Sequence, residues 1–272
     1  MTKHNCTAVS ATCPVEASPI GYYPSISANA VPCIIFFITL AIQIVLGVRR
    51  RTWSYLAALG IGTFLEAAGY AGRIVLHKNP YKPSGFKLQI ICLTVAPAFI
   101  AAGLYLNLKH LVHVFGKHLS LLKPAFYTYI FISCDTVSIT LQAVGAGLAA
   151  ASVDVTAASD IILTGLSFQV FTLLIFGATS GCFFISVFRS RRELRPETIN
   201  LRNSSVFKCF LASLVLAYTT IMIRCIYRVA AFAGGWRNSL QLNQTDFIGL
   251  DTLWVLCVGN DNGCRLLTQD LG

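Results

Sequence analysis

Residues 28–48 read ANAVPCIIFFITLAIQIVLGV, and arginines follow at positions 49, 50 and 51. The run contains no charged side chain. An α-helix rises about 1.5 Å per residue, so roughly 20 apolar residues cross the ~30 Å hydrocarbon core of a bilayer. This stretch therefore predicts a transmembrane helix with a basic loop behind it.

Five further apolar runs have a similar length. They cover approximately residues 55–76, 88–112, 125–151, 161–188 and 206–231. Of the 272 residues, 55% are hydrophobic and 12% are charged, whereas soluble domains carry about 25% charged residues. Long continuous runs, rather than short alternating segments, are typical of spanning helices. The sequence therefore predicts an all-α polytopic membrane helix bundle.

A seventh apolar run, Phe247–Val258, is shorter than the usual spanning minimum of about 17 residues. We therefore expect a seven-helix type of bundle with a short, atypical seventh segment. The expected organisation is an extracellular or lumenal tail at 1–27, the helix bundle at 28–258 and a short carboxyl-terminal tail at 259–272. The connecting loops are too short to hold a soluble domain.

The basic residues indicate the orientation. With the amino terminus outside, twelve lysines and arginines fall in the inward loops and five in the outward segments. The inward set is Arg49, Arg50, Arg51, Lys109, Lys117, Lys123, Arg189, Arg191, Arg192, Arg195, Arg202 and Lys208. The positive-inside rule then predicts an outside amino terminus. The net charge of +10 reflects insertion and contact with anionic membrane lipid, and nucleic acid is not an expected partner.

The outward segments carry candidate modification sites. Asn5 and Asn243 open Asn-x-Thr sequons that this topology places outside, where glycosylation can occur. Cys6 and Cys13 share the outside tail and could pair. The tail lacks a basic region followed by an apolar core, so the first helix itself is expected to act as the targeting signal.

Polar side chains inside the apolar runs are the candidates for function, because each ionisable residue there costs about 2.5–3.5 kcal/mol on insertion scales. Glu66, Tyr70 and Arg73 are spaced four and three apart, which places them on one helix face. A polar stripe runs down the fourth run. It consists of Asp135, Ser138 and Gln142, followed by Gly145. The other candidates are Gln169, Arg224, Tyr227, Arg228 and Asp251.

We expect these side chains to converge inside the bundle. The hypothesis is a buried cluster of Glu66, Arg73, Asp135 and Arg224, open towards the outer leaflet, that receives the polar head of a ligand. The alternative is that the charges only pair with one another and lock helix packing. Arg73 and Arg228, near helix ends, could also extend to the membrane interface.

The third run contains Pro97. Proline removes a backbone hydrogen bond, so it kinks the helix or leaves a carbonyl free. Such a kink could serve as a hinge or be a static bend that improves packing.

Several classes of protein are disfavoured by missing motifs. The sequence contains neither a phosphate-binding Gly-x-x-x-x-Gly-Lys-Ser/Thr loop nor a His-Glu-x-x-His zinc motif. No metal-ligand spacing or catalytic constellation is apparent. We therefore expect a non-enzyme without cofactor or metal.

Five ordered motifs resemble one family. They are Tyr23-Pro24-Ser25, Glu66-x-x-Gly69-Tyr70-x-x-Arg73, Ala96-Pro97-x-Phe99-x-Ala101-Ala102-x-x-Tyr105, Asp135-x-x-Ser138-x-x-x-Gln142-x-x-Gly145-x-Gly147 and Arg224-x-x-Tyr227-Arg228-Val229. The set, which runs from about residue 22 to residue 235, is similar to the fungal lipid-translocating exporter family, also called RTA-like after resistance to aminocholesterol.

The resemblance implies a seven-helix protein of the plasma or an internal membrane. Members are linked to release of sphingoid bases, porphyrin transport and tolerance of sterol-like or azole compounds. The motif residues carried over are Glu66, Tyr70, Arg73, Asp135, Gln142, Arg224, Tyr227 and Arg228. The chain departs from the family pattern at Ala230 and Ala231, where an acidic residue is usual, and after Asp251, where the family's His-Pro-Gly is missing. We expect a shortened carboxyl terminus.

The leading hypothesis is a transporter of amphipathic lipid-like molecules, such as sphingoid bases and sterol-like or toxic amphiphiles. The expected location is the plasma membrane, with stress or drug tolerance as the outcome. The alternative is a seven-helix sensor for a lipid-like ligand. The expected partners are membrane lipid and an amphipathic small molecule, and the sequence assigns no oligomeric state.

Overall fold

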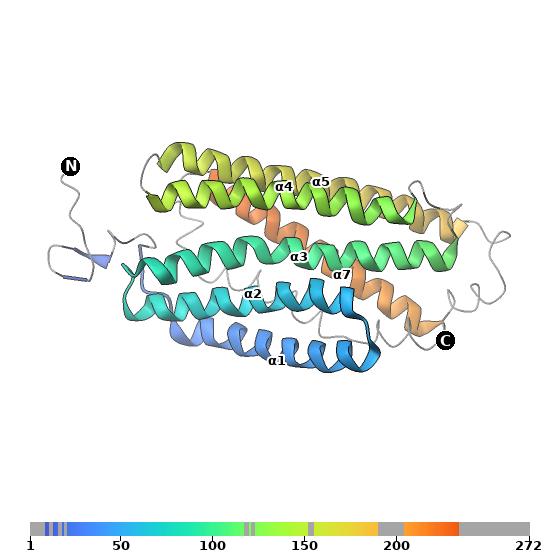
Figure 1. Cartoon of the computed structure of the whole chain (residues 1–272), viewed down its shortest axis with the longest axis horizontal. Helices are drawn as coiled ribbons and strands as arrows, with labels where there is room; N and C mark the ends of the chain where they lie inside the picture. Colours follow the sequence, from blue (N-terminus) through green and yellow to red (C-terminus); the bar gives the residue numbers. More distant parts are fainter. Residues whose placement is uncertain are drawn as a thin grey trace.

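The computed structural model describes residues 9–10, 13–15, 18, 21–116, 120, 123–151, 155–189 and 204–233. These residues form six α-helices. They are α1 (Ile26–Arg50), α2 (Trp53–Lys78), α3 (Pro83–Phe115), α4 (Pro124–Ala151), α5 (Val155–Arg189) and α7 (Ser205–Ala233) (Figure 1). The only β pairing within the described residues is an isolated bridge between Ser10 and Cys13. The prediction of an all-helical bundle is confirmed for the described residues.

The helices run up and down beside one another. α2 packs between α1 and α3, and α4 packs between α3 and α5. α7 crosses diagonally behind these helices and contacts α3 and α5 (Figure 1). We call the end where α1, α3 and α5 begin and α2, α4 and α7 end the N-terminal end of the bundle; it lies on the left in Figure 1. The opposite end is the far end.

The distribution of side chains is that of a membrane protein. Five helices, α1, α3, α4, α5 and α7, are long and apolar enough to cross a bilayer. Large apolar side chains such as Val45 and Ile185 are exposed, whereas Gln43, Thr63 and Glu66 are buried. Apolar surface facing outward and polar groups enclosed by neighbouring helices are what a hydrocarbon solvent favours.

α2 differs from the other five helices in composition. The predicted run 55–76 is helical and lies within the 26 residues of α2, a length of about 39 Å that would cross a bilayer. The helix is less apolar because it carries Glu66 and Arg73, which are both buried. The described part of the chain has six helices. The predicted seventh segment, 247–258, lies outside the described residues.

α3 and α5 extend beyond the predicted runs. α3 has 33 residues and begins at Pro83, and α5 has 35 residues and begins at Val155. Hydropathy detects only the part of a helix that lies in hydrocarbon, so the polar first turns were missed. Proline is favourable at the start of α3, because the first N–H groups of a helix have no partner within it.

The segment before α1 lies against the N-terminal end of the bundle. Ser25 caps α1 by accepting a hydrogen bond from the Ala28 N–H at 3.5 Å. The Tyr81 hydroxyl donates to the Pro14 carbonyl at 2.6 Å. Cys13 is disulfide-bonded, whereas Cys6, the partner suggested by the sequence, lies outside the described residues.

Candidate polar site inside the helix bundle

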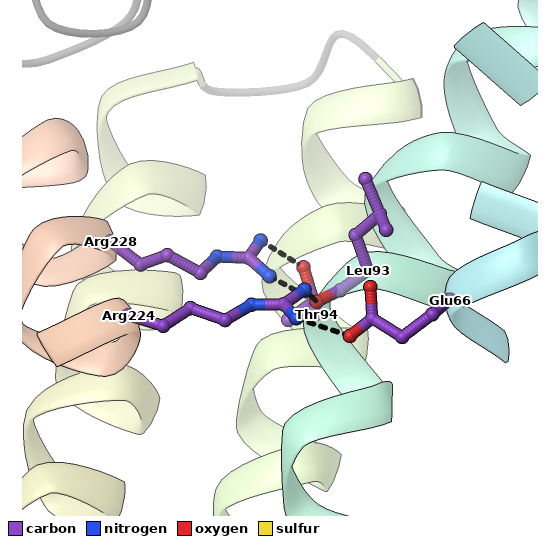
Figure 2. Close-up of polar contacts among 5 residues, drawn as sticks. All are labelled: Glu66, Leu93, Thr94, Arg224 and Arg228. Atoms are coloured by element: carbon purple, nitrogen blue, oxygen red, sulfur yellow. Dashed lines mark hydrogen bonds and ion pairs between the residues drawn. The ribbon is translucent and has the colours of Figure 1, made fainter. Parts of the chain in front are cut away.

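The site begins with a backbone carbonyl that Pro97 releases. Pro97 lies inside α3 and has no N–H, so the carbonyl four residues earlier, that of Leu93, lacks its helical hydrogen bond. The Leu93 oxygen instead accepts hydrogen bonds from Arg224 Nη2, at 3.1 Å, and from Arg228 Nη1. Figure 2 shows both guanidinium groups reaching from α7 to this carbonyl. Of the two outcomes expected for the proline, a kink or a free carbonyl, the structure shows a freed carbonyl that accepts from two cations.

Glu66 of α2 joins the same group. Its Oε1 forms an ion pair with Arg224 Nη1. Glu66 is 0% exposed and Arg224 is 3% exposed. Arg228 also donates to the Thr94 hydroxyl. We call these five residues the α2–α3–α7 junction: Glu66, Leu93, Thr94, Arg224 and Arg228 (Figure 2).

Local sequence explains how the junction is positioned. Gly69 has no side chain, and a Cβ there would collide with the side chain of Leu93, so this glycine lets α3 approach α2. Leu93 lies ten residues inside α3, which is about 15 Å from the N-terminal end. Charges at that depth are enclosed by protein and weakly screened, so removing one partner of the ion pair leaves the other charge buried at a high cost.

On α2, Arg73 lies two helical turns closer to the N-terminal end than Glu66 does. Its Nε donates to Asn29 Oδ1 at 2.7 Å, and its Nη2 donates to the Tyr22 hydroxyl at 2.8 Å. Arg73 is 2% exposed, so its guanidinium group is enclosed by protein. It therefore ties α2 to α1 and to the segment that precedes α1.

Asp135 lies at a different level from the junction. It is 4% exposed, and its Oδ2 accepts a hydrogen bond from the Tyr105 hydroxyl at 2.9 Å. Tyr105 follows Leu93 by twelve residues on α3, a rise of about 18 Å towards the far end. The structure thus separates Asp135 from the arginines with which it was expected to cluster.

The polar stripe on α4 faces α5. Ser138 Oγ donates to the Gly165 carbonyl at 2.7 Å, and Gln142 Nε2 donates to Ser138 Oγ at 2.7 Å and to Gln169 Oε1 at 3.1 Å. All three polar side chains are almost fully buried. We call Ser138, Gln142 and Gln169 the α4–α5 polar ladder. It begins one turn from Asp135 and leads towards the N-terminal end.

The other predicted site residues have varied surroundings. Tyr70 is fully buried and stacks on Phe36 with ring centroids 5.8 Å apart. Tyr227 and Arg228 are half-buried on α7. Asp251, Asn5 and Asn243 lie outside the described residues. Across the part of the chain that the structure describes, no three histidine, cysteine or acidic side chains gather as a metal site would require.

Sequence reasoning missed several partners. Tyr105 belongs to a quoted motif but was not chosen as a site residue. Asn29 and Tyr22 carry no charge and were not distinguished from ordinary polar residues. Leu93 could have been found, because it lies four residues before Pro97 and its carbonyl must lose its helical partner.

Paired charges inside a bundle with an apolar exterior define an integral, multi-pass membrane protein with a polar interior. The chain belongs to the RTA1-like family: the family model described as "RTA1 like protein" matches residues 59–259. This finding confirms the family resemblance drawn from the five motifs.

Two kinds of relative carry names that refer to transport or uptake. The chain is 33% identical over 266 residues to the sphingoid long-chain base transporter of Saccharomyces cerevisiae strain Lalvin EC1118, covering 86% of this chain and 69% of the relative. It is 34% identical over 198 residues to protoporphyrin uptake protein 1 of strain S288c, covering 72% of this chain and 63% of the relative. No solved structure matches the chain.

Proposed function

We propose that this protein is a membrane transporter of amphipathic lipid-like molecules, with sphingoid long-chain bases as the leading substrate class. The membrane-spanning helices, the family and the name of the sphingoid base transporter support this proposal. The observation that carries it is the α2–α3–α7 junction, in which a buried carboxylate and a freed carbonyl meet two arginines.

The junction has the chemistry to receive a polar head. A sphingoid base carries an amine and hydroxyl groups on one long chain. Its ammonium group would compete with Arg224 for Glu66, and its hydroxyls would bond to Thr94 or to the Leu93 carbonyl. The hydrocarbon tail would remain among the apolar side chains and the lipid. Exchange between an internal cation and a substrate cation keeps the buried carboxylate paired throughout.

The transport prediction is a loss of activity in Glu66→Gln. Purified protein in liposomes should move a fluorescent sphingoid base across the bilayer without any partner protein. Glu66→Gln removes the charge but keeps the shape of the side chain. A charge-assisted hydrogen bond contributes about 1.5–3 kcal/mol, so we expect the rate to fall at least about tenfold.

The matched control is Thr136→Ala. Thr136 is exposed, and among the described residues its hydroxyl bonds only to the Ile132 carbonyl of its own helix, so this variant should transport normally. An unchanged rate in Glu66→Gln, at equal protein content, would remove the junction from the mechanism. If the wild-type protein binds the base but moves none, the protein is a sensor for a lipid-like ligand.

The same assay addresses a second substrate chemistry. Arg224 and Arg228 could hold the carboxylates of an anionic amphiphile, as the relative named for protoporphyrin uptake suggests. If protoporphyrin slows transport of the labelled base, both molecules use the same binding site or pathway. Absence of competition would restrict the junction to cationic heads.

We also propose that the amino terminus lies outside the cytoplasm, that residues 247–258 complete a seventh span, and that the protein resides in the plasma membrane. Arg49, Arg50 and Arg189 belong to the far end of the bundle, whereas Lys78 and Lys82 belong to the N-terminal end. This distribution supports a cytoplasmic far end.

Glycosylation provides the test of topology. In this orientation Asn5 and Asn243 lie outside, so glycosidase treatment should increase the electrophoretic mobility of the protein. The shift should shrink in Asn5→Gln and in Asn243→Gln, and it should persist in Asn203→Gln, whose sequon would be cytoplasmic. A shift that depends on Asn203 alone would reverse the orientation.

A further inference from the structure

Asp135 is a buried carboxyl group whose observed contact is to a neutral side chain. Its Oδ2 accepts the Tyr105 hydroxyl at 2.9 Å, and its Oδ1 has no hydrogen-bond partner among the described residues. Glu66 provides the contrast within the same bundle, because it is paired with Arg224. An ionised carboxylate without a cation is very unfavourable in a low-dielectric interior. Something must therefore neutralise Asp135.

The surroundings of Asp135 are aromatic and closely packed. The Tyr105 ring lies 5.4 Å from Phe131 and 4.6 Å from Phe176, and the rings of Phe131 and Phe176 lie 5.3 Å apart. These rings come from α3, α4 and α5 and pack against one another at Tyr105, whose hydroxyl binds Asp135. A proton needs no additional space in such an environment, whereas a substrate head would have to displace the rings.

The titratable groups facing this region are few. α3 contributes Tyr105, α4 contributes Cys134 beside Asp135 itself, and α7 contributes the buried Cys225 on the side of Tyr105. α5 contributes the ring of Phe176. All of these groups are neutral when protonated, so a proton on Asp135 leaves the whole region uncharged.

A polar route leads away from Asp135. The α4–α5 polar ladder begins at Ser138, one turn away, and reaches Gln142 after seven residues, about 10 Å nearer the N-terminal end. Gln142 Oε1 and Gln169 Nε2 make no hydrogen bond with other described residues. The ladder thus offers an acceptor and a donor that could hold water between Asp135 and that end of the bundle.

We propose that Asp135 is a proton-binding site that couples proton movement to transport of the lipid-like substrate. This inference rests on the proposed transport function. A cationic head entering the bundle adds one positive charge. Release of the Asp135 proton to water leaves a carboxylate whose negative charge balances the substrate cation, so the net charge of the interior is restored. Uptake of a proton by Asp135 after the substrate leaves completes the cycle, so one substrate cation exchanges for one proton.

The proton site can be tested without transport. Infrared difference spectra of the purified protein in liposomes, recorded against pH, should show the carbonyl stretch of a protonated carboxylic acid. The band should be absent in Asp135→Asn. It should be retained in Glu66→Gln, because Glu66 is paired with Arg224 in the wild-type protein and so does not give rise to the band. Loss of the band in Glu66→Gln but not in Asp135→Asn would overturn the assignment, as would the absence of any such band.

The coupling is tested with a substrate that cannot carry a proton itself. The probe is a fluorescent N-trimethylated sphingoid base, and potassium with valinomycin holds the membrane potential at zero. One-for-one exchange predicts that accumulation of the probe changes about tenfold for each unit of imposed pH difference. Asp135→Asn should move the probe only down its own concentration gradient, with no response to pH difference.

The outcomes separate the two proposals. Wild-type transport that ignores the pH difference would overturn the coupling and leave the transport function standing. No movement of either the probe or the unmethylated base would overturn the transport function and the coupling together, while the infrared band would still decide whether Asp135 binds a proton. Binding of the probe that is lost only in Asp135→Asn would assign the site to the substrate ammonium and overturn the proton assignment.

Discussion

Replacing Arg224 with leucine is expected to lower the free energy of unfolding by about 3–5 kcal/mol, because it leaves a buried carboxylate without its cation. Glu66 is 0% exposed and cannot reach water without unpacking α2 from α3 and α7. The Leu93 carbonyl would lose one donor but keep Arg228. Chemical unfolding in detergent micelles, followed by loss of helical circular dichroism, measures the change.

A double-mutant cycle separates the ion pair from its surroundings. Glu66→Leu combined with Arg224→Leu should cost less than Arg224→Leu alone, since neither charge then remains buried. Thr136→Ala serves as the control and should change stability by less than about 0.5 kcal/mol. Strictly additive effects of the two leucine substitutions would contradict a direct interaction between Glu66 and Arg224.

Substituting Gly145 with alanine is expected to destabilise the pairing of α4 and α5 by about 1–3 kcal/mol, the usual cost of overpacking. A Cβ on Gly145 would lie 2.9 Å from the Ala158 carbonyl oxygen and 3.0 Å from the Ile162 nitrogen. Both atoms belong to the backbone of α5, so the helices would have to separate. The same chemical unfolding experiment measures this loss.

Gly147 provides a control two residues away on the same helix. A Cβ there would meet nothing within 4 Å, and alanine is favoured over glycine in a helix interior by about 1 kcal/mol. Gly147→Ala should therefore be neutral or slightly stabilising. Equal destabilisation by both substitutions would contradict close approach to α5 as the reason for the glycine at 145.

Much of the fold could be predicted from local sequence. The run 28–48 appears within α1, and 88–112 appears within α3, because about 20 apolar residues suffice to specify a spanning helix. The ends of the helices were predicted less well. α5 begins at Val155 rather than near Ile161, since a helix continues past the hydrocarbon while the hydropathy signal does not.

The candidate site was predicted only in part. Glu66 and Asp135 were expected to be enclosed by protein, and both are buried. Of the expected cluster, Glu66 does meet Arg224. Arg73 instead binds Asn29 and Tyr22, and Asp135 binds Tyr105. Spacing along a helix reveals which side chains share a face, but it does not reveal how neighbouring helices are rotated and shifted in depth.

The sequence by itself determined that this chain enters the membrane as helices and that certain charged residues lie within them, because transfer into hydrocarbon depends on each segment alone. Only the tertiary structure decided the partners. Glu66 and Arg224 are 158 residues apart in the chain, and they meet at the Leu93 carbonyl through the order, tilt and depth of three helices. The order, tilt and depth of the helices are set by packing between them, and this packing exists only once the bundle has formed.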